Sequence, residues 1–389
     1  MRSSQKAVKA LPASRSSGVP YRRVLIVGLG LIGGSLALAL RRSGFLGSLV
    51  GVSRPESLGE GKRLGAIDEG FDYTELARAA VGAELIILAT PIEKIREHVK
   101  ILGKAALKAG TIVTDVGSTK VEILEAARRF LPKNVHFIGG HPMAGSEKQG
   151  MAAADPFLFQ NAYYILTPSP TVPESEVTRL GEFVGRTGAR VLVLEAGEHD
   201  RVAAAISHVP QLLAVALVNS LDGLGPLREI AVRLAAGGFR DMTRIASSPF
   251  TVWRDILASN SGEIGASLDR LRALVEQALE RVRLGEKGLP SIEATFDHAA
   301  ATRSMIPRDT KGFLRPLADV LVVVEDRPGV IAKVSAALAG KGINIQDIEV
   351  LKVRIGEGGS LRLGFATHAL AEEAVRVLAA HEFTARVRE

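Results

Sequence analysis

The stretch "RVLIVGLGLIGGSLALALRRSG", Arg23–Gly44, decides the fold of the N-terminal half of the chain. A short apolar run ends in a glycine-rich turn, which leads into an apolar segment with helical periodicity. Gly28, Gly30 and Gly33 occupy the glycine positions of the G-x-G-x-x-G pattern. With Leu31 and Ile32 they are predicted to bind the pyrophosphate of a dinucleotide, because a helix N-terminus presents free N–H groups. The alternative is a tight turn without a ligand.

The remainder of the N-terminal half repeats this strand–helix alternation. Further strand-like runs are "SLVGVS", "ELIILAT", "GTIVTDVGS", "VHFIGG", "AYYILTP" and "RVLVLE". Short runs bounded by Gly, Thr or Asp and separated by helical patterns indicate parallel strands in an α/β sheet. Residues 21–195 are therefore predicted to form a Rossmann-type dinucleotide-binding domain.

Helical periodicity replaces this alternation after residue 195. The segment 196–311 is predicted to be an all-helical domain, with a linker-like connection around Gly288–Pro316. Its apolar stretch "RVAAAISHVPQLLAVALV" has few polar positions, so a homodimer is predicted to cover it. Residues 318–389 follow a strand–helix–strand–strand–helix–strand order, which indicates a ferredoxin-like α+β domain.

Composition and charge limit the possible partners. The net charge is +7, and the first 23 residues hold six basic and no acidic residues, so the remainder is nearly neutral. Residues 1–20 are predicted to be a disordered basic tail, and no nucleic acid partner is expected. The chain has no cysteine, which fits a cytoplasmic enzyme. Apolar runs such as "ELIILA" are of strand length, so no membrane span is expected.

The end of the second predicted strand bears on the choice of cofactor. An NAD enzyme usually has an acidic residue there to bind the ribose 2′-hydroxyl. This chain has Ser53 and Arg54 instead. A hydroxyl and a guanidinium suit a 2′-phosphate, so NADP is favoured slightly over NAD. The alternative is a surface arginine at the end of a strand.

The glycine-rich stretch "GGHPMAGSEKQG", Gly139–Gly150, places His141 on a loop. Loops carry binding and catalytic residues disproportionately often, although a lone histidine can also be a plain surface residue.

Taken together, the motifs resemble those of the prephenate/arogenate dehydrogenase (TyrA) family with a C-terminal ACT domain. The matching segments are "GLGLIGGSLA", "ATPI", "TDVGSTK", "GGHPMAGSEKQG", "HDRVAAAISHVPQ" and "FRDMTRIASSPFTVW". The resemblance implies oxidative decarboxylation of prephenate or arogenate in tyrosine biosynthesis, with hydride transfer to NADP or NAD and no metal.

The resemblance also implies roles for single residues. His141 would accept the proton of the ring hydroxyl, for which an imidazole is well suited, and Ser118 would hydrogen-bond to His141 and orient it. Arg244 would bind a substrate carboxylate bidentately. The other implied substrate contacts are His208, Gln211, Glu147, Ser146 and Trp253, and Thr90 and Pro91 of "ATPI" are implied cofactor contacts.

Several of these residues have structural alternatives. Arg244 could form an ion pair with Asp241, and His208 could be a core histidine. Many family members have a second histidine where this chain has Gln211, so a role that needs ionisation is in doubt there.

In the C-terminal module, "VVVEDRPGVIAKVSAALAGKGINIQDIEV" resembles the opening of an ACT domain. Asp326, Gly329 and Asn344 are implied effector contacts, with Asn344 expected at the start of a strand and tyrosine as the natural effector.

Two rival functions are weighed against this interpretation. A 6-phosphogluconate-type or other β-hydroxyacid dehydrogenase usually has a lysine base on the first long helix, but no lysine lies between Glu198 and Asn260. A non-catalytic, amino-acid-sensing ACT protein would have broken catalytic motifs, but His141, Ser118 and Arg244 are present.

Overall fold

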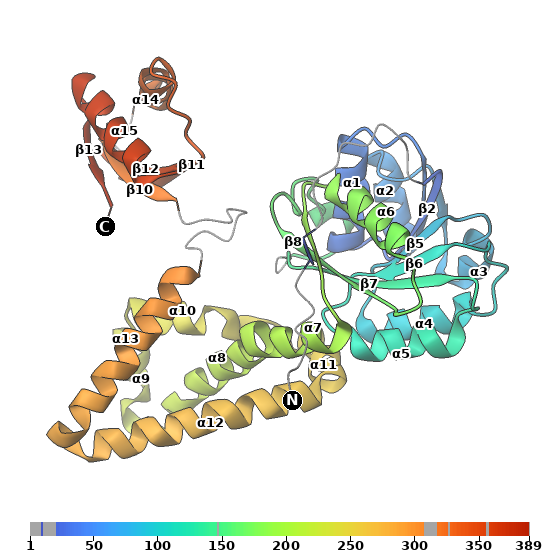
Figure 1. The fold of residues 1–389 in the computed structure, drawn as a ribbon, viewed down its shortest axis with the longest axis horizontal. Coiled ribbons are helices and arrows are strands. Elements are labelled where there is room, and N and C mark those ends of the chain that lie inside the picture. Colours follow the sequence, from blue (N-terminus) through green and yellow to red (C-terminus); the bar gives the residue numbers. More distant parts are fainter. Residues whose placement is uncertain are drawn as a thin grey trace. The chain divides into compact units, whose positions relative to one another are not determined.

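The computed structural model describes residues 9–10, 21–145, 148–306, 317–325, 327–354 and 358–388. The chain divides into two compact units, Met1–Glu293 and Ala294–Glu389. The first contains a nine-stranded sheet and most of the helical segment, and the second contains a four-stranded sheet (Figure 1).

The nine-stranded sheet has the order β1-β9-β8-β7-β6-β5-β2-β3-β4. Its strands are β1 (Lys9–Ala10), β2 (Arg23–Val27), β3 (Ser48–Val52), β4 (Glu69–Phe71), β5 (Leu85–Leu88), β6 (Ile112–Asp115), β7 (His136–Pro142), β8 (Tyr163–Pro168) and β9 (Arg190–Val193). All seven strands predicted for residues 21–195 are present. The sequence did not reveal β4, because three residues are too few to show periodicity.

Two details of the sheet differ from the prediction. Lys9 and Ala10 pair antiparallel with β9, so these two residues of the tail predicted to be disordered form an edge strand. Their pairing depends on backbone groups of β9, which no side-chain pattern reports. In addition, β8 runs antiparallel to β7. A parallel neighbour needs a crossover, usually a helix, whereas in the described part of the connection between β7 and β8 the only regular element is a short 3₁₀ turn, Met151–Ala153.

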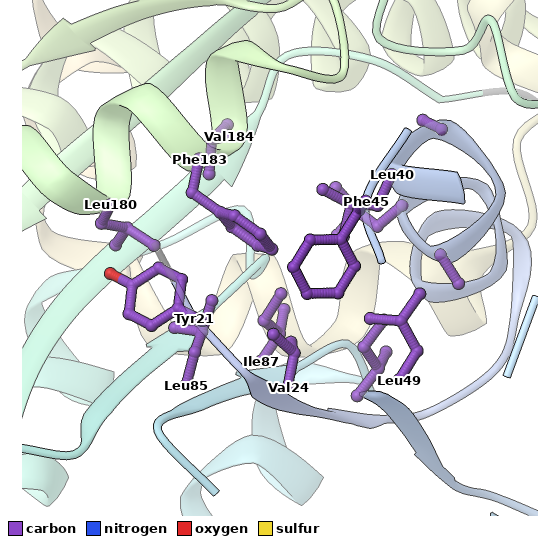
Figure 2. Packing of buried hydrophobic residues seen from close by; sticks show 14 of the residues in the cluster. Tyr21, Val24, Leu40, Phe45, Leu49, Leu85, Ile87, Leu180, Phe183 and Val184 are labelled. Carbon is purple, nitrogen blue, oxygen red and sulfur yellow. The ribbon is translucent and has the colours of Figure 1, made fainter. Parts of the chain in front are cut away.

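Helices cover both faces of this sheet (Figure 1). One face holds α1 (Leu31–Arg42), α2 (Pro55–Arg63) and α6 (Glu174–Gly185), and the other holds α3 (Leu76–Ala79), α4 (Ile92–Leu102) and α5 (Val121–Phe130). The ring of Phe183, a residue of α6, makes edge-to-face contacts with Tyr21 and Phe45, at centroid distances of 5.0 and 5.3 Å (Figure 2). Burial on both faces explains why the central strands are apolar throughout.

The helical segment contains α7 (Ala196–Ala203), a π-helical turn (Ala204–His208), α8 (Val209–Asn219), a 3₁₀ segment (Ser220–Leu227), α9 (Arg228–Leu234), α10 (Gly237–Thr243), a 3₁₀ turn (Arg244–Ser247), α11 (Phe250–Ser259), α12 (Ser261–Arg283), a 3₁₀ turn (Gly285–Gly288) and α13 (Leu289–Met305). The prediction of a linker from Gly288 is wrong up to Met305. Pro290 is the second residue of α13, where its missing N–H leaves no helical hydrogen bond unmade.

The second unit confirms the predicted order of strands and helices. It contains β10 (Ala318–Val324), α14 (Val330–Ala339), β11 (Asp347–Arg354), β12 (Gly358–Phe365), α15 (His368–Ala380) and β13 (Thr384–Val387). The sheet order is β11-β12-β10-β13, and every pair is antiparallel. Apolar side chains of β10 and β12 form one core with α14 and α15.

Candidate active site

The glycine turn after β2 has the shape that a dinucleotide needs. Gly28 has φ +98°, a conformation that favours glycine. A Cβ on Gly33 would lie 2.0 Å from the carbonyl oxygen of Gly28, so a side chain there would push α1 away from the turn. A Cβ on Gly30 would meet nothing within 4 Å, and no side chain caps the N-terminus of α1. The turn therefore leaves both space and free N–H groups for a phosphate.

A cleft of about 910 Å³ opens beside this turn. Its lining includes the predicted cofactor residues Gly28, Gly30, Ser53, Arg54, Thr90 and Pro91. The loop that follows β7, the strand that contains His141, contributes Gln149 and Gly150 to the cleft. The cleft thus joins the predicted cofactor site to the catalytic loop.

Ser53 and Arg54 have different surroundings at the end of β3. The Ser53 hydroxyl is buried and accepts a hydrogen bond from the Leu29 N–H at 3.2 Å, so it braces the glycine turn. Arg54 is exposed, lines the cleft and forms no ion pair within the described part of the chain. Its guanidinium is therefore the group here that is free to bind an anion.

His98 lies on the far wall of the same cleft and was not predicted. Its ring stacks on Tyr73 at 5.6 Å, and its Nδ1 lies 3.2 Å from the Thr90 hydroxyl. Burial lowers its pKa below the ordinary histidine value. A neutral, flat aromatic pair suits a planar ring of the cofactor better than a phosphate.

His141 lies near the end of β7 and contacts a second histidine. Its Nδ1 is 2.8 Å from Nε2 of His199, and Nδ1 of His199 is 2.8 Å from Oδ1 of Asp200. His199 and Asp200 belong to α7, so a helix completes the surroundings of His141. His141 itself lies in strand β7 and not on a loop as predicted, because it pairs with Ile165 of β8.

The two glycines before His141 allow the strand to approach a buried ion pair. A Cβ on Gly140 would lie 2.4 Å from the backbone oxygen of Asp115. Lys120 donates hydrogen bonds to the Asp115 carboxylate and, at 2.7 Å, to the carbonyl oxygen of Gly140. Asp115 also accepts from the N–H groups of Gly117 and Gly140. This completely buried pair holds the backbone next to His141 in place.

Both predicted histidines of the site are neutral at physiological pH. Burial, reinforced by the neighbouring His199 and Lys120, holds the pKa of His141 well below its ordinary value. Burial also lowers the pKa of His208 to about 4. Asn260 donates to Nδ1 of His208 at 3.2 Å and to the carbonyl oxygen of Asp200 at 2.8 Å. Because Nδ1 accepts, the proton of neutral His208 is on Nε2.

His208 contacts one other predicted substrate residue. Its ring makes an edge-to-face contact with Trp253 at 6.1 Å. Gln211 is buried and donates to the carbonyl oxygen of Ile245 at 3.0 Å, which ties α8 to the turn that carries Arg244. Arg244 is exposed, and no ion pair joins it to Asp241 within the described ranges.

The other predicted catalytic, substrate and effector residues are either placed differently from the prediction or lie outside the described residues. Ser118 is half-buried, and within the described residues it makes no hydrogen bond to His141, whose ring is held instead by His199. Ser146, Glu147 and Asp326 lie outside the described residues. Gly329 caps α14 with φ +87°, whereas Asn344 lies in the loop before β11 and not at the start of the strand as predicted.

Sequence reasoning missed His199, Asp200, Asn260 and Lys120 as parts of the site. The adjacent pair in "HDRV" was a usable signal, because an acidic residue next to a histidine is unusual in an apolar helix. Among the described residues, no group of three His, Cys, Asp or Glu side chains could hold a metal ion.

A glycine turn that opens on a cleft and, in the same unit, a pair of hydrogen-bonded histidines are features that fit a nicotinamide-dependent dehydrogenase. The comparisons with known proteins narrow this class. The family description "Prephenate dehydrogenase, nucleotide-binding domain" matches residues 36–193, and "Prephenate dehydrogenase, dimerization domain" matches residues 195–296. The "ACT domain" description matches residues 318–380.

Individual relatives agree. The chain is 36% identical to prephenate dehydrogenases of Bacillus subtilis and of Lactococcus lactis, over 92% of this chain and 97% of each relative. A crystal structure of prephenate dehydrogenase from A. aeolicus with hydroxyphenyl propionate and NAD+ is 30% identical, covers 72% of this chain and 98% of its own, and has a TM-score of 0.65. Synechocystis arogenate dehydrogenase is 31% identical with the same coverage and TM-score. The chain belongs to the prephenate dehydrogenase family, and it is a nicotinamide-dependent oxidoreductase. The rival functions are not supported.

One finding bears on the expectation that no segment spans a membrane. The helical run Ala196–Leu234 has 39 residues and is, by length and composition, apolar enough to cross a bilayer. Within it, 33% of the apolar 18-residue window is buried. The sequence argument considered only strand-sized runs. The run is broken at Gly225–Pro226, and it lies in the segment that matches the dimerisation domain.

Proposed function

We propose that this chain oxidatively decarboxylates prephenate, with NADP as its preferred hydride acceptor. The observation that carries the proposal is the His141–His199–Asp200 chain of hydrogen bonds, in the same unit as the cleft at the glycine turn. Both relatives that are 36% identical along nearly the whole chain are named for prephenate, which favours prephenate over arogenate.

The bound cofactor supplies the hydride acceptor, and the residues of this chain supply the rest. His141 accepts the proton of the ring hydroxyl as carbonyl character develops on that carbon. Arg244 binds a carboxylate of the substrate with its fork of donors. His208, with its proton on Nε2, would donate a hydrogen bond to the substrate. Ser118, Trp253, Gln211, Ser146 and Glu147 would border the substrate. Loss of carbon dioxide then makes the ring aromatic.

The activity is tested by following reduced nicotinamide at 340 nm with each of the two substrates and each of the two dinucleotides. Prephenate with NADP should give the highest kcat/KM. His141→Asn should lower kcat by about two to four orders of magnitude, as is typical for loss of a general base. Cofactor binding, measured by fluorescence, should persist. Near-normal turnover in this variant would refute the role of His141.

The cofactor preference rests on Arg54. Arg54→Ala should weaken NADP binding about tenfold or more and leave NAD binding unchanged, because only NADP carries a 2′-phosphate. The matched control is Arg63→Ala. Arg63 is an exposed arginine at the end of α2, the helix that follows Arg54, and it forms an ion pair with Glu60. Equal losses for both dinucleotides would show that Arg54 does not read the 2′ position.

The homodimer is proposed from the surface of the helical segment. Large apolar side chains are exposed along α8, α9 and α12: Leu213, Val215, Val218, Ile230, Val232, Leu234, Leu274, Val275, Leu279 and Val282. A second copy of the chain would cover them, since contiguous apolar surface of this extent marks an interface. Sedimentation in detergent-free buffer should give a dimer at micromolar concentration. A stable monomer, or a protein that needs detergent, would count against this proposal and against a cytoplasmic enzyme.

For the second unit we propose tyrosine as an inhibitory effector. Gly329 begins α14 in the left-handed conformation, and the N-terminus of α14 can accept a carboxylate. Asp326 and Asn344 would complete the site. The proposal is supported by the ACT match and by the biosynthetic family of the first unit.

A further inference from the structure

His199 and Asp200 are almost completely buried, each about 1% exposed, behind His141. Asp200 accepts two backbone hydrogen bonds at the start of α5, from the N–H of Lys120 at 2.8 Å and of Val121 at 2.9 Å. The N-terminus of a helix favours negative charge, so this is a good place for a carboxylate. Asp200 is therefore an acceptor only, and it cannot donate to His199.

This arrangement assigns the protons of both imidazoles. Nδ1 of His199 carries a proton, because it lies against the Asp200 carboxylate. In neutral His199 the other nitrogen, Nε2, is then unprotonated and accepts from Nδ1–H of His141. Nε2 of His141 is left with a free lone pair, which is the form that a base requires.

The low pKa of His141 limits its strength as a base. The pKa of its ring is held well below the ordinary value by burial and by the neighbouring His199, Lys120 and His208, so the ring alone is a poor proton acceptor at neutral pH. His199 lies 2.8 Å away and has a carboxylate at its far side, where an imidazolium would be stabilised.

We propose that His199 is the residue on which the substrate proton comes to rest, with His141 passing it on and Asp200 stabilising the charge. This inference rests on the proposed function of His141. The hydroxyl O–H bond breaks and the proton joins Nε2 of His141. At the same time the Nδ1–H bond of His141 breaks and that proton joins Nε2 of His199. The hydride leaves the same ring carbon for the cofactor. When carbon dioxide departs, the electron pair moves to the oxygen, and the proton returns along the same path to form the phenol.

Within the described part of the chain, Lys120 and His208 lie near His141, and His208 also lies near His199 and Asp200. Asn260 holds the backbone of Asp200. None of these lies between the two imidazoles, which are in direct hydrogen-bonding contact.

The test is His199→Gln, whose amide oxygen can still accept from His141 but cannot take a proton. We expect kcat/KM for prephenate to fall about 10- to 100-fold, with the acid limb of the pH profile moved to lower pH because His141 is then the sole base. A proton inventory in mixed H₂O and D₂O should be curved for the wild type, with two protons in motion, and linear for the variant. His136→Gln, the same change at the other end of β7, should behave as the wild type.

The relay would be overturned if the variant lost the same factor in kcat/KM at every pH, kept the acid limb of the wild type and still gave a curved proton inventory. His199 would then only position His141. If His199→Gln does not fold, Asp200→Asn carries the test, since it keeps one acceptor oxygen, replaces the other by an NH2 group and removes the charge, and the same shift is expected. Full activity of His141→Asn would instead refute the proposed function, so the two failures are distinguishable.

Discussion

Arg244 and Gln211 lie on neighbouring elements, and one hydrogen bond ties together the segments that carry them. The Gln211 amide holds the backbone of Ile245, directly after Arg244. A buried amide in this role does not need to ionise, which explains how this position can function without the histidine found in many family members. The same bond limits where the Arg244 guanidinium can be placed.

Arg244→Ala should raise the KM for prephenate at least tenfold and lower kcat less, because the lost contact exists in the ground state. Arg244→Lys should have an intermediate effect, since it keeps the charge and loses the bidentate fork. Steady-state kinetics with both variants test whether Arg244 binds the substrate. An unchanged KM in the alanine variant would leave Arg244 as a structural residue.

His208 should make stability depend on pH. Its pKa is lowered to about 4 in the folded state, so the unfolded chain binds more protons between about pH 6.5 and 4. Stability should therefore fall as the pH falls, by about 1–2 kcal/mol between pH 7 and 5 from this residue. Urea unfolding at both pH values measures the difference, and His208→Gln should reduce it. The same pH dependence in the variant would contradict the assignment.

At the level of elements, the contact of α1 with the glycine turn decides whether the cleft can hold a cofactor. Gly33 touches Gly28 so closely that no larger residue fits without moving the helix. Because α1 also carries Leu36 and Leu40 in the core of one sheet face, such a movement would disturb packing as well as binding.

Gly33→Ala should lower dinucleotide affinity at least tenfold and destabilise the protein by about 1–3 kcal/mol, the usual range for overpacking. Isothermal titration with NADP and thermal unfolding report the two effects. Gly185→Ala, where the added methyl meets nothing within 4 Å, is the matched control and should change neither. A Gly33→Ala protein with normal affinity would show that α1 adjusts without consequence.

At the level of the whole molecule, two units with separate cores are joined in one chain. An effector on the second unit can change activity in the first only if it binds two states of the enzyme with different affinity. Covalent attachment alone does not provide this coupling.

Removal of residues 318–389 should leave an enzyme that turns over prephenate and no longer responds to tyrosine. Initial rates with 0–1 mM tyrosine, on the order of a typical effector range, compare the two chains. Sedimentation of the truncated chain checks that it still forms a dimer. If tyrosine inhibits both chains equally, it acts as a product analogue at the active site and the effector proposal fails.

The sequence alone determined the order of domains, the seven main strands, the dinucleotide turn and the motif that contains His141, because each depends on local periodicity or on a contiguous motif. The tertiary structure alone decided that β8 runs antiparallel, that Lys9 and Ala10 add an edge strand, and that α13 continues past Gly288. It also decided that His199 and Asp200 stand behind His141, and that Lys120 holds Gly140. The His141–His199 contact joins residues 58 positions apart, and the Lys120–Gly140 contact joins residues 20 positions apart. The direction of β8 and the pairing of β1 are set by neighbouring backbone. No local pattern of side chains encodes these contacts.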